Sequence, residues 1–150
     1  MDTYWSKQDI QELAKAQTYT DLLTIAKRVL ARMPRPIVQV CGPISTGGAG
    51  SMKKNLERFD RAIQVLRAKG INLFNQMPFE EPMQLIRKRE ANGYSVKLLE
   101  EFYLPIFRDR LIDELFFLPD WQSSTGAKWE HEQGKRFGLK ISYLEGKEYQ

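Results

Sequence analysis

The chain has one cysteine and one histidine in 150 residues, and it has no apolar run as long as a membrane-spanning helix. A single cysteine, Cys41, cannot form an internal disulfide, which favours a reducing compartment. His131 alone cannot build a zinc site of several cysteines and histidines, so we expect no metal. The first residues are neither basic nor followed by an apolar stretch, so we expect no secretory signal. These shortages predict a cytoplasmic protein with no membrane partner.

Charge of one sign is also in short supply. The formal net charge is +4 at pH 7, but acidic and basic residues are interspersed along the whole chain. A nucleic-acid-binding surface gathers its basic residues into a patch or stripe, so we do not expect nucleic acid as the main partner. The small positive excess mildly favours a small anionic ligand.

Hydrophobic periodicity divides the chain near residue 35. Two amphipathic segments, 6–16 and 20–33, predict an N-terminal helical extension over residues 1–35, because prolines at 34 and 36 end the second helix. From residue 36 to 150, strand-like and helix-like segments alternate. We expect strands at 37–41, 71–74, 115–118 and 140–144, and helices at 52–69, 79–91, from Ser95 through a kink at Pro105, and at 124–137.

This alternation predicts an α/β domain, a flavodoxin-like or Rossmann-like three-layer sandwich with a mostly parallel sheet of 4–5 strands. The fifth strand would lie near residues 78–90. In such sheets, ligands bind just beyond the carboxyl ends of the strands.

The loop after the first predicted strand is rich in glycine and hydroxyl side chains. It matches neither the dinucleotide pattern nor the Walker pattern, so we expect no cofactor of those kinds. Its position still favours contact with a ligand, and the alternative is a flexible surface loop. The residues expected to contact the ligand are Gly42, Pro43, Ile44, Ser45, Thr46, Gly47 and Gly48.

The helix predicted from Ser124 carries the candidate catalytic residue, Glu130. Gly126, Glu130 and Gly134 follow at intervals of four, on one helix face. Glycine inside a helix costs about 1 kcal/mol relative to alanine, so this stripe suggests close packing or close approach of a ligand. The alternative is that Glu130 is a solvated surface charge, as most glutamates are.

Other candidates carry weaker signals. Asn75 and Asp120 lie near predicted strand ends and are expected to contact the ligand. His131 follows Glu130 directly and so faces another direction on the helix, which argues against a Glu-His dyad. Cys41 is most simply a small buried strand residue.

Three segments together resemble the nucleoside 2-deoxyribosyltransferase superfamily. They are Val40-Cys41-Gly42-Pro43-Ile44-Ser45, the strand ending Leu118-Pro119-Asp120-Trp121, and the run from Ser124 through Gly126 to Glu130. The resemblance extends over about residues 37 to 144. It is greatest to small members of the superfamily, which is related to the 2′-deoxynucleoside 5′-phosphate N-hydrolases.

This resemblance implies cleavage or transfer of the bond between a nucleobase and its sugar. Glu130 would match the family's nucleophile, and the reaction would follow the two steps of retaining glycoside hydrolysis. Ser124 matches a position that is aspartate in nucleoside transferases and serine in nucleotide hydrolases. A hydroxyl at a helix start suits a phosphate and a carboxylate would repel it, so a nucleoside 5′-monophosphate is favoured over a nucleoside. The resemblance also implies a homo-oligomer, a dimer or larger.

Departures from the family pattern keep other functions open. No acidic residue stands in the register where family enzymes handle the base, since Glu101 and Asp109 do not align, and Asp120 replaces a glycine. Asp113 starts a strand and reads as structural. The alternative is therefore a nucleotide-binding module without catalysis. A further rival is a phosphoribohydrolase, but the stretch Gly47-Gly48-Ala49-Gly50 is a poor match to the signature of that family. Another is an interaction protein that binds through its N-terminal helices.

Overall fold

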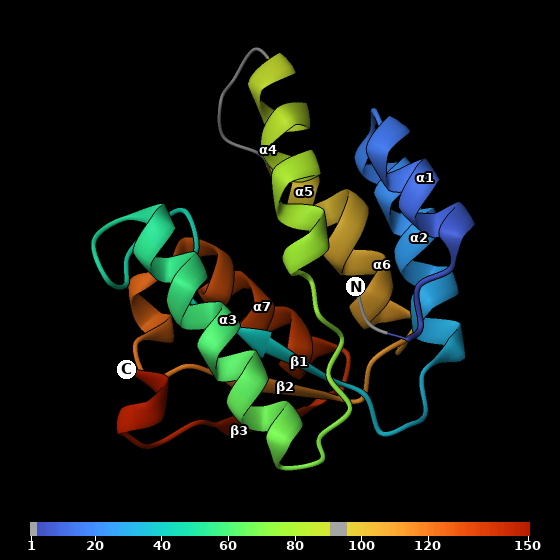
Figure 1. The fold of residues 1–150 in the computed structure, drawn as a ribbon. Coiled ribbons are helices and arrows are strands. Elements are labelled where there is room, and N and C mark those ends of the chain that lie inside the picture. The colour runs from blue at the N-terminus through green and yellow to red at the C-terminus, as the bar shows by residue number, and fades with distance from the viewer. Residues whose placement is uncertain (1–2, 91–95) are drawn as a thin grey trace. The chain divides into compact units, whose positions relative to one another are not determined.

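The computed structural model describes residues 3–90 and 96–150. The chain divides into two compact units (Figure 1). Unit 1 consists of Met1–Met33 and Gln76–Leu111, and unit 2 consists of Pro34–Asn75 and Ile112–Gln150. The two N-terminal helices therefore share a unit with helices that follow residue 76, whereas the sequence suggests a division near residue 35.

Unit 2 contains a parallel sheet of three strands in the order β1-β2-β3. The strands are β1 Val38–Cys41, β2 Glu114–Phe117 and β3 Lys140–Tyr143. Each is short, and Val38 pairs with Glu114, which in turn pairs with Lys140. All three strands therefore end at one edge of the sheet, where the loops after β1 and β2 meet. The α/β class is confirmed.

The described residues form fewer strands than the 4–5 predicted. The stretch 71–74 contributes only an isolated parallel bridge between Leu73 and Val38. The stretch 78–90, where a fifth strand was possible, is a 3-10 turn at Met77–Phe79 followed by helix α4, Glu80–Arg89. The physical reason is that Pro78 and Pro82 remove backbone donors that a strand ladder needs but the first turn of a helix does not.

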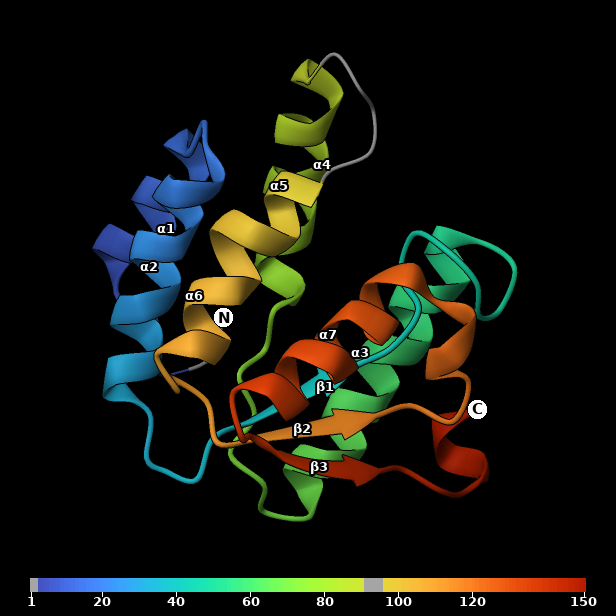
Figure 2. The same cartoon turned by 180° about the vertical axis from the view of Figure 1, so that it is seen from behind.

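Two helices lie on opposite faces of the sheet in unit 2, α3 (Met52–Ala68) and α7 (Thr125–Arg136), as Figures 1 and 2 show. Side chains alternate between the faces of a strand. The side chains that face α7 come from odd-numbered positions, and contacts with Glu130, Gly134 and His131 identify them as Gln39, Cys41, Leu115, Phe117 and Ile141.

Both helices begin and end where the sequence predicts. The Ser51 hydroxyl accepts a hydrogen bond from the Lys54 N–H at the start of α3, and the Ser124 hydroxyl accepts one from the Ala127 N–H at the start of α7. Gly70 and Gly138 follow the two helices with positive φ, which glycine adopts without the steric penalty of a side chain. Cap residues in the sequence were therefore reliable guides to these boundaries.

Unit 1 is helical. Its helices are α1 Lys7–Lys15, α2 Tyr19–Arg32, α4, α5 Val96–Leu98, the π-helix η2 Leu99–Tyr103, and α6 Leu104–Arg108. Ser6 and Thr18 each form a capping box at the start of α1 and α2. A chain of ring contacts runs through the core of the unit, from Trp5 to Phe79 to Phe102 and Tyr103.

The predicted kink at Pro105 takes the form of a wide π turn. Pro105 has no N–H and its ring would collide with the carbonyl four residues earlier in a regular helix. The chain avoids this collision by widening to the π-helix η2 just before α6, so the helical path continues through the proline. The predicted helix start at Ser95 lies outside the described residues.

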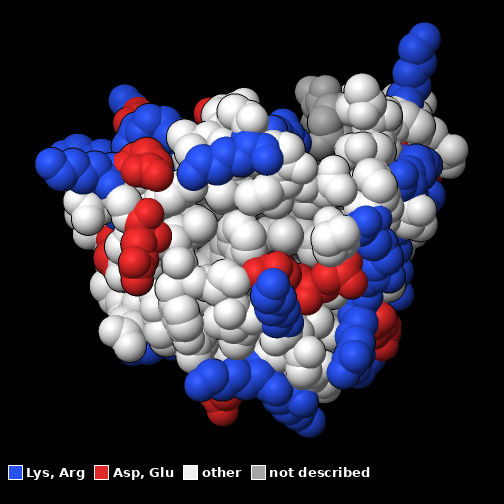
Figure 3. All heavy atoms as spheres, turned by 90° about the horizontal axis from the view of Figure 1, so that it is seen from below, with Lys and Arg blue, Asp and Glu red and all other residues white. Residues whose placement is uncertain are grey.

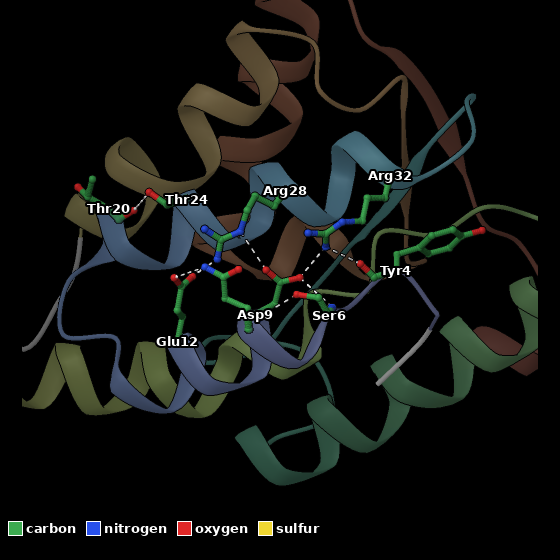
Figure 4. Close-up of polar contacts among 9 residues, drawn as sticks. Tyr4, Ser6, Asp9, Glu12, Thr20, Thr24, Arg28 and Arg32 are labelled. Carbon is green, nitrogen blue, oxygen red and sulfur yellow. Dashed lines mark hydrogen bonds and ion pairs between the residues drawn. The ribbon is translucent and has the colours of Figure 1, made fainter.

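A buried carboxylate, Asp9, joins α1 to α2 (Figure 4). Its side chain is fully buried and accepts hydrogen bonds from the Ser6 N–H, the Arg28 Nε at 2.9 Å and the Arg32 Nη1. Burial raises the pKa of Asp9, but these donors outweigh burial and hold the pKa well below its usual range. Arg28 also contacts Glu12. Four side chains thereby tie the first two helices together.

Two surface properties follow from the described residues. None of their helices has both the length and the apolar character needed to cross a membrane. The face drawn in Figure 3 carries basic and acidic side chains next to one another, as the interspersed sequence predicts.

Candidate functional site

Glu130 lies on α7 and points toward strand β1 rather than into bulk solvent. Only 8% of its surface is exposed. Its Oε2 accepts a hydrogen bond from the Gln39 amide at 2.8 Å and lies 3.4 Å from the Cys41 thiol. Gly126, Glu130 and Gly134 share a helix face, so the side of α7 that carries Glu130 packs on the sheet. The reading of Glu130 as a solvated surface charge is therefore wrong.

Gln39 is a polar residue in the middle of a buried strand, and it is fully buried. One end of its amide donates to Glu130, while the carbonyl oxygen Oε1 is buried without a hydrogen-bond partner. An unpaired buried carbonyl costs about 1–3 kcal/mol. We did not expect Gln39 from the sequence, although a glutamine between Val38 and Val40 in a buried strand is the signal that could have identified it.

Cys41 contributes a thiol rather than a nucleophile. Burial raises the pKa of Cys41 well above its ordinary value, and the neighbouring charge of Glu130 raises it further. The thiol therefore keeps its proton and points it at Glu130 Oε2. This matches the prediction that Cys41 is a small buried strand residue.

The glycine-rich loop after β1 is held by Asn55, a buried residue one turn into α3. The Asn55 amide nitrogen donates to the carbonyls of Ile44 and Gly47, and its oxygen accepts from the Ala49 N–H at 2.8 Å. Gly48 has positive φ, and a Cβ there would lie 2.4 Å from the Asn55 oxygen. The path of the loop is therefore fixed by hydrogen bonds between Asn55 and the loop backbone.

The same loop is tied to the start of α7. The Gly48 N–H donates to the Ser123 hydroxyl at 2.9 Å, and the Thr125 N–H donates to the Thr46 hydroxyl at 3.2 Å. A Cβ at Gly47 would lie 2.1 Å from the Ser123 carbonyl oxygen, so the two loops are in direct contact. Residues 45–50 remain exposed. The loops after β1 and β2 therefore form one edge.

The two ends of the loop are used differently. Gly42 and Pro43 are buried, and a Cβ at Gly42 would lie 2.5 Å from a side-chain carbon of Leu118. This glycine serves the close approach of β1 and β2 at their carboxyl ends. Ser45, further along the loop, is exposed.

The glycines of α7 separate into two roles. A Cβ at Gly134 would lie 2.6 Å from Leu115 Cδ1, so this glycine allows the helix to pack closely on β2. A Cβ at Gly126 would meet nothing closer than the Ser124 hydroxyl at 3.9 Å. Only Gly126 therefore leaves open space beside the start of the helix.

Ser124 and Asp120 lie directly before elements that follow β2, whereas Asn75 lies next to no strand end. Ser124 is buried and its oxygen caps α7. Asp120 forms an ion pair with Arg58 of α3 at 2.8 Å, and Arg58 is itself nearly buried. Asn75 is half-buried and lies two residues after the Leu73 bridge. Asp120 is thus engaged in joining α3 to the loop after β2.

His131 follows Glu130 by one position, about 100° around α7, and contacts Phe117 of β2 and Trp121 rather than β1. Its ring stacks on Trp121 with a centroid separation of 4.2 Å, and its Nε2 lies 2.7 Å from the Tyr143 hydroxyl. Burial lowers the pKa of His131, and the charge of Lys135 lowers it further. The structure thus agrees with the prediction that Glu130 and His131 form no dyad.

Asp113 lies at the amino end of β2, away from this edge. Its carboxylate accepts from the Ile37 N–H at 2.7 Å and from the Arg35 guanidinium. It joins the amino ends of β1 and β2, consistent with a structural role. Over residues 3–90 and 96–150, no group of three or more histidine, cysteine or acidic side chains is arranged to hold a metal ion.

No curated protein and no solved structure matches the chain. Residues 37–143, which begin just before β1 and end with β3, match a family described as a domain of unknown function, DUF4406. This match includes β1, Glu130 and the loops on either side of them, and the chain belongs to the DUF4406 family.

Proposed function

We propose that the protein cleaves or transfers the N-glycosidic bond of a nucleoside 5′-monophosphate or nucleoside, with Glu130 as the nucleophile. The observation that carries this proposal is the position of the Glu130 carboxylate. It is 8% exposed, and one of its oxygens is fixed by the Gln39 amide 2.8 Å away. A carboxylate held in this way can attack a sugar carbon without first being reoriented.

The reaction has two balanced steps. In the first, a Glu130 oxygen bonds to the anomeric carbon while the bond to the base breaks, and the base nitrogen keeps the electron pair and takes up a proton. In the second, the oxygen of water or of an acceptor bonds to the same carbon and releases its proton, while Glu130 leaves as a carboxylate. This is the two-step route of retaining glycosidases.

Gln39 and Cys41 support this role as positioning residues. Both are neutral donors that orient one carboxylate oxygen. Carboxylates that act as nucleophiles must remain ionised and available to the substrate. In this proposal, the need to orient Glu130 explains why a buried glutamine, Gln39, is present on β1 despite its energetic cost.

The substrate would lie along the edge formed by the loops after β1 and β2. The hydroxyls of Ser45 and Thr46, the open space beside Gly126 and the start of α7 gather there. A helix start with nearby hydroxyls favours a phosphate. In this proposal the protein acts in the cytoplasm as a homo-oligomer and needs no cofactor.

A second candidate is a nucleotide-binding module without catalysis. The observation that favours it is also Glu130, because a hydrogen-bonded buried carboxylate can serve to pin α7 to β1. The two functions make opposite predictions for replacement of Glu130 by glutamine. A structural pin predicts a loss of stability, whereas a nucleophile predicts a loss of turnover in a folded protein.

The test is release of free base from a panel of ribonucleoside and deoxyribonucleoside 5′-monophosphates, each paired with its dephosphorylated nucleoside. We expect release from at least one nucleotide, faster than from its nucleoside. Glu130→Gln should lower the rate about a thousandfold or more while the melting temperature stays near that of the parent. Glu132→Gln, an exposed neighbour on the same helix, is the matched control. Absence of base release together with thermal stabilisation by nucleotides would favour the binding module.

A further inference from the structure

A pocket lies at the carboxyl ends of β2 and β3. It has a volume of about 270 Å³, and its lining includes Leu118, Pro119, Trp121, Tyr143, Leu144 and Glu145. The position is the one where open parallel sheets bind ligands. Glu130 faces β1, on the other side of β2, so this pocket is separate from the proposed catalytic site.

Two aromatic rings line this pocket and are fixed by their neighbours. Trp121 and Tyr143 lie with ring planes 28° apart and centroids 6.2 Å apart. His131 stacks on Trp121, and its Nε2 lies 2.7 Å from the Tyr143 hydroxyl. Tyr143 is nevertheless 53% exposed, which is unusual for a ring held in place so well. Exposed rings with fixed orientation are suited to stacking with a flat ligand.

The charged residue of the lining selects among flat ligands. Glu145 is exposed, and an ionised carboxylate can only accept hydrogen bonds. Adenine and cytosine each place an acceptor nitrogen beside their amino group, which a carboxylate would repel. Guanine places two donors side by side, the ring N–H and the amino group, and can pair with both carboxylate oxygens.

We propose that this pocket binds the guanine ring of a nucleoside or nucleotide. The ring stacks on the exposed side of Tyr143, which Trp121 and His131 hold in place, while its donor edge pairs with Glu145. Leu144, which is half-buried, adds an apolar side chain to the lining. The site uses no residue of the proposed reaction, so it stands whether or not the chain cleaves glycosidic bonds.

Calorimetric titration of the full chain with guanosine, inosine and adenosine tests the site. The Glu130→Gln variant is titrated in parallel, because a variant without turnover separates binding from cleavage. Inosine differs from guanosine only in lacking the amino group, so it should bind about tenfold more weakly. Adenosine should bind more weakly still. Equal affinity for all three nucleosides, or no binding of guanosine up to its solubility limit, overturns the proposal.

Variants of the lining locate the binding. Tyr143→Ala should weaken guanosine binding about tenfold through loss of stacking. Glu145→Gln should remove the preference for guanosine over inosine, while Glu148→Gln, an exposed acid on the same segment but not in the lining, should keep it. Circular dichroism checks that each variant is folded. A preference for guanosine that survives Glu145→Gln, or that Glu148→Gln lowers equally, also overturns the proposal.

Discussion

Asp9 in unit 1 and Glu130 in unit 2 are both buried carboxylates, but their surroundings differ in kind. Asp9 accepts from two arginines and from the backbone of its own helix start, all within the first two helices. Glu130 accepts from an amide and lies against a thiol, both on a strand 89 or more residues away in sequence. The first arrangement neutralises a charge for structure. The second fixes a carboxylate oxygen through a neutral amide on a neighbouring strand.

A third buried carboxyl, Glu80, gives the largest expected effect. Its pKa is raised by burial, whereas the pKa of Asp9 is lowered by its partners. Burial raises the pKa of Glu80 to about 7, against a smaller lowering by Arg87. A raised pKa in the folded state means stability that is present below about pH 4.5 and is lost as the pH rises through 7. The loss should be about 3 kcal/mol.

Urea unfolding of the protein at pH 5 and at pH 8.5 measures this loss. Glu80→Gln should remove most of the difference between the two pH values, because the amide has no proton to lose. Glu81→Gln on the same turn is the control. If the parent and Glu80→Gln lose equal stability at high pH, burial of Glu80 is not its cause.

Asp9→Asn should be the next largest change. It removes the charge that two guanidiniums share, and because Arg28 and Arg32 are each about a third or more exposed, we discount the loss to about 2 kcal/mol. The lowered pKa of Asp9 also implies that its contribution is present above about pH 3.8 and is lost as the pH falls below it.

Unfolding of Asp9→Asn and of the parent at pH 7 and at pH 3 checks both statements. The difference between the two proteins should shrink at the lower pH. Glu12→Gln, which loses only the more exposed of the two acidic partners of Arg28, should cost less than half as much. Equal losses of stability for Asp9→Asn and Glu12→Gln would show that the buried carboxylate of Asp9 contributes no more than the exposed one of Glu12.

Gln39→Leu sharpens the other half of the comparison. It removes the amide that holds Glu130 and also removes the unpaired Gln39 oxygen, so the two effects on stability should nearly cancel, to within about 1 kcal/mol. The rate of base release should nevertheless fall about tenfold, through a lower kcat with little change in KM. Val40→Ile, on the other face of the same strand, is the control. Loss of stability without loss of kcat would identify the amide as structural.

The two glycines of α7 should give small changes in stability with opposite signs. Gly134→Ala should destabilise by about 1–2 kcal/mol, because its Cβ would collide with Leu115. Gly126→Ala meets open space and should stabilise the helix by about 0.5–1 kcal/mol. Thermal unfolding measures both. Stabilisation at 126 combined with slower base release would indicate that the substrate approaches the helix there.

The sequence predicted those features that local chemistry decides. Ser51 and Ser124 each mark a helix start because a side-chain oxygen satisfies free N–H groups, and Gly70 and Gly138 mark ends because positive φ favours glycine. The stripe with Glu130 was placed on one helix face, but the sequence left open whether that face is buried. The strand count was too high, since a short segment such as 71–74 can pair at one position only, and that depends on neighbours distant in sequence.

The surroundings of Glu130 could not be predicted for the same reason. Gln39 and Cys41 come to Glu130 only when α7 packs on β1, across a separation of 89 to 91 residues. The pairing of Asp120 with Arg58 likewise depends on how α3 packs beside β2. A single sequence shows that Gln39 interrupts a buried apolar strand, but not which charge it serves.

The manner in which Asn55 holds the loop after β1 has a consequence for how the sequence of this loop can change. Asn55 hydrogen-bonds to backbone carbonyls and an N–H of residues 44, 47 and 49. These bonds do not involve the side chain at position 45, which is exposed. Substitutions there should leave the path of the loop unchanged, so this part of the surface can diversify without refolding.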